Sequence, residues 1–156
     1  MLLTCLPKSF FSYDYRVLGT SLGDAEVQFG VCSKPGKICL GQDALAARMH
    51  SWFTGRWTLE KEGCVCVEAR QPRLLRRVFE LNGEGGKFTL QAQSAFRCRY
   101  DLFSGEERVG SIWPAHAFTK RAYIDCDTAV PECTQLFAFW IAALNWRNTA
   151  HAVPGV

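Results

Sequence analysis

The chain has 156 residues, of which 48% are hydrophobic and 21% are charged, and its formal net charge at pH 7 is +3. This length suits one domain with a sizeable core, and the composition excludes an intrinsically disordered protein. A net charge of this size does not by itself indicate a nucleic-acid-binding protein. The N-terminus lacks a basic region followed by a long apolar core, so we expect no signal peptide and a cytoplasmic location.

Most of the chain alternates between apolar and polar residues with a period of two, which predicts half-buried β-strands. In chain order, the expected strands are 13–18, 25–31, 37–40, 57–61, 64–70, 75–81, 88–92, 96–102, 108–113 and 122–126. The segment 43–50 is short, and its sequence is compatible with a helical turn as well as with a strand. Gly-containing turns separate the strands at a spacing of about ten residues, which suits an antiparallel barrel or sandwich. No Pro- or Ser-rich linker divides the chain, so we expect one domain over 1–156.

One stretch near the C-terminus has no polar face. Every residue from Leu136 to Leu144 is apolar, yet these nine residues are fewer than the roughly 20 that a membrane-spanning helix needs. Pro131 and Glu132 suit a first helical turn and Arg147 suits a last one. A helix that is apolar all round cannot lie on a protein surface. We therefore predict a helix over about 131–147, enclosed by a closed sheet.

Six short motifs run through these segments. They are Trp57-x-Leu59, Arg77-x-Phe79-Glu80-Leu81, Arg99-Tyr100-x-Leu102, Val109-Gly110-x-Ile112, Arg121-x-x-x-Asp125 and Gln135-x-Phe137-x-x-Trp140. Together they resemble the tubby C-terminal-like superfamily, which includes the phospholipid scramblases and the LURP-one-related proteins. The resemblance covers about 13–147. It implies a mainly β fold, a closed antiparallel barrel of about twelve strands around a central hydrophobic C-terminal helix. The calcium-binding acidic loop and the palmitoylation-type cysteine cluster of scramblases are missing, so it implies a fold more than an activity.

A cluster of cations is the main candidate site. Its members are Arg70, Arg73, Arg76 and Arg77, with Lys120 and Arg121 at the equivalent place in the second half of the chain. Clustered cations bind phosphorylated headgroups, and tubby proteins bind phosphoinositides through basic residues of the barrel surface. The resemblance therefore implies an anion or lipid-headgroup site here. The nearby Glu68, Glu80 and Asp125 fit the alternative, in which these charges only solvate the surface.

The eight cysteines, at positions 5, 32, 39, 64, 66, 98, 126 and 133, form no paired Cys-x-x-Cys modules. We expect reduced, structural thiols, no metal and no cofactor. If Val65 points inward with Val67, then Cys64 and Cys66 point outward and are accessible for chemistry; the opposite phase buries both thiols.

Catalysis and nucleic-acid binding have weaker support. His50, His116 and His151 stand in no nucleophile or metal motif. Apart from Trp113 and Tyr123, the aromatic residues alternate into the expected interior, so platforms for bases are lacking and we expect no nucleic acid. The sequence predicts a non-catalytic binding or scaffold module for an anionic phospholipid headgroup or another phosphorylated ligand, in the cytoplasm or at the membrane surface. A protein–protein adaptor and an enzyme that uses an exposed cysteine or histidine stay open.

Overall fold

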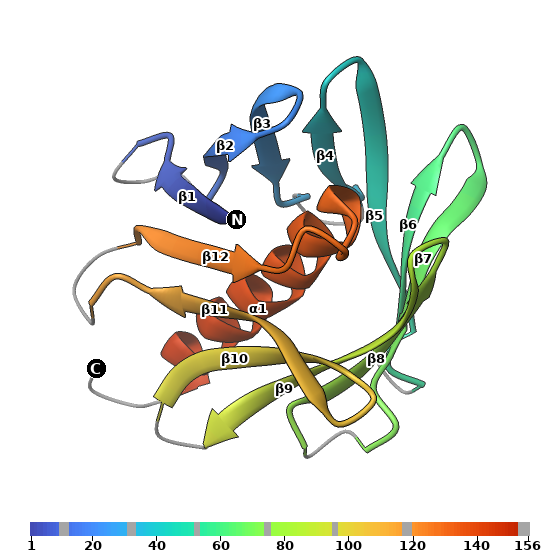
Figure 1. The fold of residues 1–156 in the computed structure, drawn as a ribbon, viewed down its shortest axis with the longest axis vertical. Coiled ribbons are helices and arrows are strands. Elements are labelled where there is room, and N and C mark those ends of the chain that lie inside the picture. The colour runs from blue at the N-terminus through green and yellow to red at the C-terminus, as the bar shows by residue number, and fades with distance from the viewer. Residues whose placement is uncertain are drawn as a thin grey trace.

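The computed structural model describes residues 1–9, 13–30, 34–51, 54–73, 76–94, 97–116 and 120–152. Twelve antiparallel strands form a closed barrel around one C-terminal helix (Figure 1). The predicted fold class, a mainly β closed antiparallel barrel around a hydrophobic helix, is therefore confirmed.

The strands follow one another around the barrel in chain order. They are β1 (Leu2–Pro7), β2 (Tyr15–Thr20), β3 (Gly23–Gln28), β4 (Gly36–Leu40), β5 (Asp43–Ser51), β6 (Arg56–Lys61), β7 (Cys64–Arg70), β8 (Val78–Gly83), β9 (Gly86–Ser94), β10 (Arg97–Ser104), β11 (Glu107–Pro114) and β12 (Ala122–Cys126), and the helix is α1 (Glu132–Ala152). Each strand pairs with its neighbours in sequence, and β1 closes the ring by pairing with β12. The closing register places Leu3 opposite Ile124.

Two strands differ from the expectation. The segment 43–50, for which a helical turn was one alternative, belongs to β5. This strand pairs with β4 and β6 along its length. Its Leu45 and Ala47 are buried, so the segment alternates with period two and cross-strand packing overrides the helix propensity of its alanines. Strand β1 was not expected at all, although Leu3 and Cys5 are fully buried. The expected strands 75–81 and 96–102 each begin outside the described residues.

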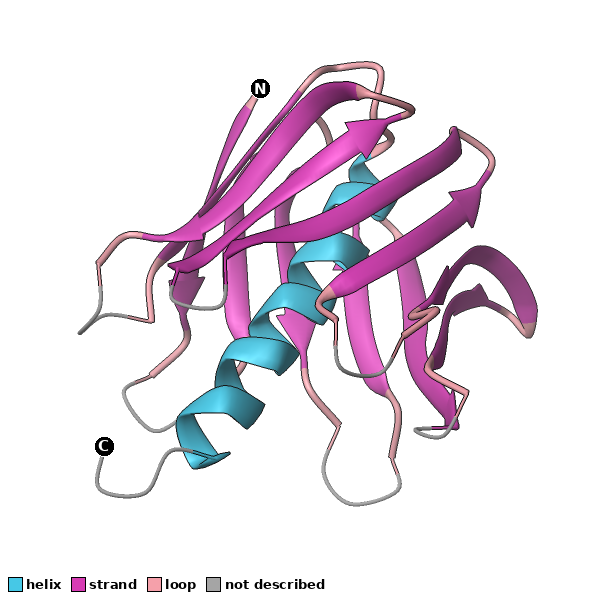
Figure 2. Cartoon of the chain, turned by 90° about the horizontal axis from the view of Figure 1, so that it is seen from below, coloured by secondary structure: helices cyan, strands magenta, loops and turns pink. Residues whose placement is uncertain are grey.

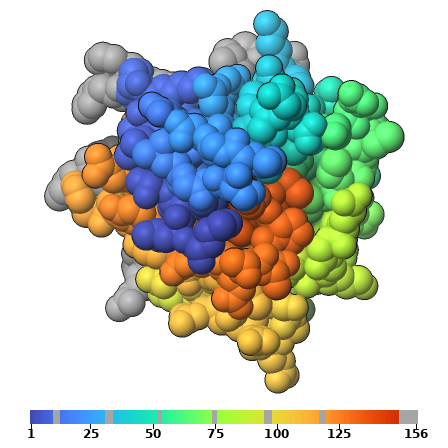
Figure 3. Space-filling view, turned by 45° about the horizontal axis from the view of Figure 1, so that its top comes forward, coloured from blue at the N-terminus to red at the C-terminus, as the bar shows by residue number. Residues whose placement is uncertain are grey.

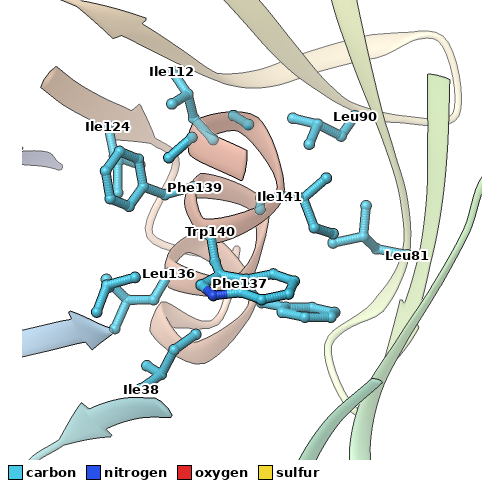
Figure 4. Close-up of a cluster of buried hydrophobic side chains, with 14 of the residues drawn as sticks. Ile38, Leu81, Leu90, Ile112, Ile124, Leu136, Phe137, Phe139, Trp140 and Ile141 are labelled. Carbon is cyan, nitrogen blue, oxygen red and sulfur yellow. The ribbon is translucent and has the colours of Figure 1, made fainter. Parts of the chain in front are cut away.

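The helix α1 passes through the barrel from one end to the other (Figure 2). From Leu136 to Ala142, seven successive residues are each at most 5% exposed, so every side of the helix is covered, as its composition predicted. Around it lie inward-facing residues of five different strands, namely Ile38, Leu81, Leu90, Ile112 and Ile124 (Figure 4). No helix in the described ranges is long and apolar enough to cross a membrane.

Aromatic rings fix the helix along the barrel axis. The Trp140 ring stacks on Phe29, with centroids 5.9 Å apart, and on Phe137, with centroids 6.0 Å apart. The residue before Trp140, Phe139, meets Tyr15 edge to face with ring centroids 5.0 Å apart. Such pairs add stability beyond the area that they bury, and they also require one position of the helix relative to the strands.

The beginning of α1 is held by the neighbouring hairpins. Glu132 accepts hydrogen bonds from the backbone N–H of Ser21 at 3.0 and 3.1 Å, and Gln135 Nε2 donates to the carbonyl of Val130 at 2.9 Å. Gly85 lies so close to Pro131 that a Cβ atom on it would be 2.3 Å from Pro131 Cγ. On this face, the segment leading into the helix (orange) is enclosed by N-terminal strands (blue) and by strands coloured green to yellow (Figure 3).

Candidate functional site: the cationic end of the barrel

The strand order separates the connections into two groups. Because consecutive strands are antiparallel, connections fall alternately at the two ends of the barrel. We call one end the helix-start end; it holds the connections β2–β3, β4–β5, β6–β7, β8–β9, β10–β11 and β12–α1. We call the other the helix-tail end; it holds the connections β1–β2, β3–β4, β5–β6, β7–β8, β9–β10 and β11–β12, together with the last turns of α1.

Charge divides between these two ends. In the described residues of its connections, the helix-tail end has seven cations and one acid. The cations are Lys8, Lys34, Arg73, Arg76, Arg77, Lys120 and Arg121, and the acid is Asp14. The connections of the helix-start end, all of them described, have four acids and no cation. These acids are Glu62, Glu84, Glu106 and Asp127. The fold thus gathers all the cations of the sequence-predicted site at one end, since Arg70 is the last residue of β7 there.

Three cations at this end, Arg56, Arg70 and Lys8, are already paired. Arg70 Nε lies 2.6 Å from Glu68 Oε1, and Arg56 Nη2 lies 2.9 Å from the other oxygen of the same carboxylate. The hydrogen bond from Arg70, followed by that from Arg56, lowers the pKa of Glu68 although partial burial opposes this. Lys8 forms a similar ion pair with Glu26 at 2.9 Å. Arg70 is therefore a weaker candidate for anion binding than the sequence indicated.

The β7–β8 connection presents two of the predicted cations outward. Gln71 Nε2 donates to the carbonyl of Arg76 at 2.7 Å, and the Arg76 N–H donates to the carbonyl of Arg73 at 3.0 Å. These bonds form a turn in which the side chains of Arg73 and Arg76 are exposed, and neither makes an ion pair with the described residues. Arg77 is half-buried instead, and its charge acts on Tyr100 by opposing the rise in pKa that burial causes there.

The β11–β12 connection brings together residues that the sequence did not group. Lys120 Nζ lies 4.6 Å from the centroid of the Tyr13 ring, and Arg147 Cζ lies 4.4 Å from the same centroid. Tyr13 and Arg147 were missed because they come from opposite ends of the chain and carry no local motif. Arg121 is exposed beside them, and its carbonyl accepts a hydrogen bond from the Ala115 N–H at 2.8 Å.

The cysteine pair follows neither predicted phase. Val65 is 52% exposed, whereas Val67 is buried and Cys66, between them, is half-buried against the core. The register explains this, because Leu59 pairs with Val67 and the next residue of β6 pairs with Val65, which leaves Cys66 as the extra residue of a β-bulge. Cys64 alone of the pair is exposed.

Two of the other described thiols, those of Cys5 and Cys126, are buried. Burial raises the pKa of Cys5 well above its ordinary value and that of Cys126 to about 12, so both stay protonated and unreactive. None of the seven cysteines in the described ranges forms a disulfide; Cys32 lies outside them. The described residues contain no group of His, Cys, Asp and Glu side chains suited to a metal ion.

One polar cluster has catalytic residue types, but its hydroxyl group is buried. Thr58 Oγ1 donates to Glu60 Oε2 at 2.8 Å and lies 2.6 Å from His50 Nε2. Because the hydroxyl proton goes to Glu60, His50 Nε2 must donate to Thr58. The Thr58 side chain is fully buried, so a substrate cannot reach this hydroxyl. His116 is exposed at the helix-tail end, and the side chain of His151 lies outside the described residues.

Comparison of the chain with known protein families, with curated proteins and with solved structures gives no match. The function must therefore be inferred from the geometry and charge of the barrel.

Proposed function

We propose that the protein is a non-catalytic binding module that places the helix-tail end of its barrel against a membrane surface rich in anionic phospholipids. The observation that carries this proposal is the division of charge, with seven cations and one acid in the described connections of this end and four acids without a cation in those of the other. Each Lys or Arg close to an anionic surface is worth about 1 kcal/mol of attraction. The acidic helix-start end is repelled, so the same field also orients the barrel.

The spacing of the cations favours an extended surface over a single phosphate. Arg73 and Arg76 belong to the β7–β8 connection, whereas Lys120 and Arg121 belong to the β11–β12 connection, and β9 and β10 lie between these pairs in the barrel. A site for one phosphate brings several donors onto the same group. Cations spread around a rim instead match many separate headgroups, as in the attraction of polybasic segments to a lipid leaflet.

The sequence of the same connections favours lipid over a soluble polyanion. The parts of these connections that lie outside the described residues read Phe10-Phe11-Ser12, Val31-Cys32-Ser33, Trp52-Phe53, Leu74-Leu75, Ala95-Phe96 and Ala117-Phe118-Thr119. Large apolar and aromatic residues combined with Lys and Arg are the composition typical of segments that bind at membrane interfaces. Kinship with the tubby-like superfamily is part of the proposal, and a barrel around a central C-terminal helix supports it.

The two rival functions have less support. A partner strand can add to a sheet only at a free edge, and every described strand pairs with a neighbour on both sides. A protein–protein adaptor would then have to use a face of the barrel. An enzyme needs an accessible nucleophile held by a base, and in the His50–Thr58–Glu60 cluster the only hydroxyl, that of Thr58, is buried.

Sedimentation with lipid vesicles tests the proposal. We expect binding to vesicles of phosphatidylcholine mixed with phosphatidylserine, no binding to phosphatidylcholine alone, and loss of binding at about 1 M salt, where the Debye length falls to about 3 Å. An excess of inorganic phosphate should not compete, because no single phosphate site is involved.

A pair of matched variants shows which end binds. Arg73→Glu with Arg76→Glu should abolish sedimentation. Lys87→Glu with Arg108→Glu makes the same change in net charge with exposed residues near the helix-start end and should leave binding intact. Equal binding by both variants, or no binding by the parent protein, would refute the proposal.

A further inference from the structure

A cavity of about 300 Å³ lies beside the last turns of α1 at the helix-tail end, and we call it the tail cavity. Its walls are mostly apolar and include Tyr15, Phe29, Ala143 and Trp146, and Lys120 and Arg147 also line it. This volume is at the lower limit of ordinary ligand pockets, which are typically concave, largely apolar and equipped with a few polar groups. None of the sequence motifs pointed to it, because its walls come from both ends of the chain.

Interactions within the protein hold these walls in place. Trp146 Nε1 donates to the carbonyl of Cys98 at 2.7 Å, and the indole meets Phe139 edge to face with centroids 6.2 Å apart. Tyr15 and Phe29, which also line the cavity, make an edge contact with ring centroids 6.4 Å apart. A ligand therefore meets a preformed apolar wall and need not order it, which lowers the cost of binding.

Among the described residues that line the cavity, the side chains with a formal charge, Lys120 and Arg147, are both cations. Arg147 makes no ion pair with the described residues, and with Lys120 it lies over the Tyr13 ring. Asp14, the one acid in the described connections of this end, accepts a hydrogen bond from the Phe29 N–H at 3.0 Å. A ligand that complements these walls needs an apolar body and an anionic group at one end.

We propose that the tail cavity binds a fatty acid, with its acyl chain against Tyr15, Phe29 and Trp146 and its carboxylate at Lys120 and Arg147. The choice of a lipid rests on the proposed function. A water molecule occupies about 30 Å³ of liquid, so the cavity takes roughly ten groups of that size, which is one chain of about ten carbons and not the two chains of a phospholipid. Affinity should rise about fourfold for each added methylene until the cavity is full.

Two exposed cysteines allow a direct test with an internal reference. Cys98 lines the tail cavity, whereas Cys64 begins β7 at the helix-start end. Each is alkylated with N-ethylmaleimide, and the rate at each thiol is followed by peptide mass spectrometry with and without decanoate below its aggregation concentration. We expect saturating decanoate to slow alkylation of Cys98 at least tenfold and to leave Cys64 unchanged. No protection of Cys98, or equal slowing at both cysteines, would overturn the proposal.

The carboxylate is tested separately from the chain. Decanol has the same chain without the charge and should protect Cys98 only at a concentration at least tenfold higher. In the variant Arg147→Gln, decanoate and decanol should protect Cys98 at similar concentrations. The variant Arg147→Lys keeps the positive charge and should retain part of the preference for decanoate. Equal protection of the parent protein by decanoate and decanol would overturn the assignment of the carboxylate to the two cations.

The outcome is distinguishable from that of the vesicle experiment. The double variant Arg73→Glu and Arg76→Glu should lose vesicle binding yet keep protection of Cys98 by decanoate. Vesicle binding without protection by decanoate would mean that this inference fails and the proposed function stands. Protection by decanoate without vesicle binding would mean that the proposed function fails and the cavity takes a free fatty acid from solution.

Discussion

Gly36 of β4 packs against the indole of Trp140 in α1 so closely that a Cβ atom on Gly36 would lie 2.7 Å from Trp140 Nε1. The same Cβ atom would lie 2.7 Å from the carbonyl oxygen of Gln28 in the neighbouring strand. Real Cβ atoms do not approach other atoms this closely, so the wall of the barrel and the helix inside it are matched at this point to within one methyl group.

Replacing Gly36 by alanine should therefore destabilise the protein by about 1–3 kcal/mol, because the added methyl group has no space. Denaturant unfolding measures this. Trp140→Phe removes the indole nitrogen, so the double variant Gly36→Ala with Trp140→Phe should be more stable than the sum of the single changes predicts. A neutral Gly36→Ala, or strictly additive effects, would show that the two residues are not in tight contact.

Replacing Trp140 by alanine should lower the free energy of unfolding more than Gly36→Ala does. Trp140 is 5% exposed and stacks on Phe29 and Phe137, so Trp140→Ala leaves a void that is expected to cost about 3–5 kcal/mol. This is a large part of the ~5–15 kcal/mol that holds a typical domain folded. Met49→Ala is the matched control, because Met49 is 53% exposed and its loss should change stability by no more than about 0.5 kcal/mol.

Deleting the helix α1 should destabilise the fold more than any point substitution. A fragment of residues 1–130 lacks the whole filling of the barrel, and the inward side chains of its strands, such as Leu59, Leu90 and Ile112, would face water. We expect an aggregating fragment without a cooperative thermal transition. A soluble fragment that melts cooperatively would mean that α1 is peripheral to the fold.

Alkaline pH should destabilise the protein through two buried phenols. Burial raises the pKa of Tyr15 and of Tyr100 from 10.0 to about 12, so the folded state keeps both protonated after the unfolded chain has begun to ionise. Their contribution is complete below about pH 10 and is lost as the pH rises from about 10 to about 12. Thermal midpoints measured across this range should fall, and they should fall less steeply for Tyr15→Phe with Tyr100→Phe.

The control is the pair of tyrosines that are not buried in the core, Tyr13→Phe with Tyr123→Phe. This variant should keep the steep fall with pH. Tyr100 adds a second readout at neutral pH, since its buried hydroxyl has no hydrogen-bond partner among the described residues and Tyr100→Phe should be neutral or stabilising. Clear destabilisation by that change would show that the hydroxyl has a partner.

The helix and most strands were predictable because the burial of side chains requires a regular pattern of apolar residues in the sequence. The helix was recognised from apolar residues on all its sides, and strands such as β7 and β12 from alternation with period two. Strand β1 lacked a clear alternation, because Leu2 and Leu6 of its outward face are apolar and Leu2 is 55% exposed. In β5, the alanines matched a helix as well as a strand, and only pairing with β4 and β6 decides between them.

The candidate site was predictable only where its residues are adjacent in the sequence. The arginines of the β7–β8 connection were recognised as a cluster because they are neighbours along the chain. The contact of Lys120 and Arg147 with Tyr13 forms only when the barrel closes, so no local pattern reports it. The position of Cys66 was missed for a different reason, since a bulge shifts the alternation and is not visible in the sequence of one strand.

Closure of the barrel between β1 and β12 has a consequence for synthesis on the ribosome. Strand β1 is synthesised before the other strands of the barrel and pairs with β12, the last of them, and the backbone N–H of Cys126 donates to the carbonyl of Met1 at 3.2 Å. The helix that fills the interior comes later still. During translation the growing sheet therefore has two open edges and an empty apolar face until β12 and α1 have emerged, which is the kind of species that aggregates or binds chaperones. Slow or interrupted translation between β11 and α1 should lower the yield of folded protein far more than the same pause between β1 and β2.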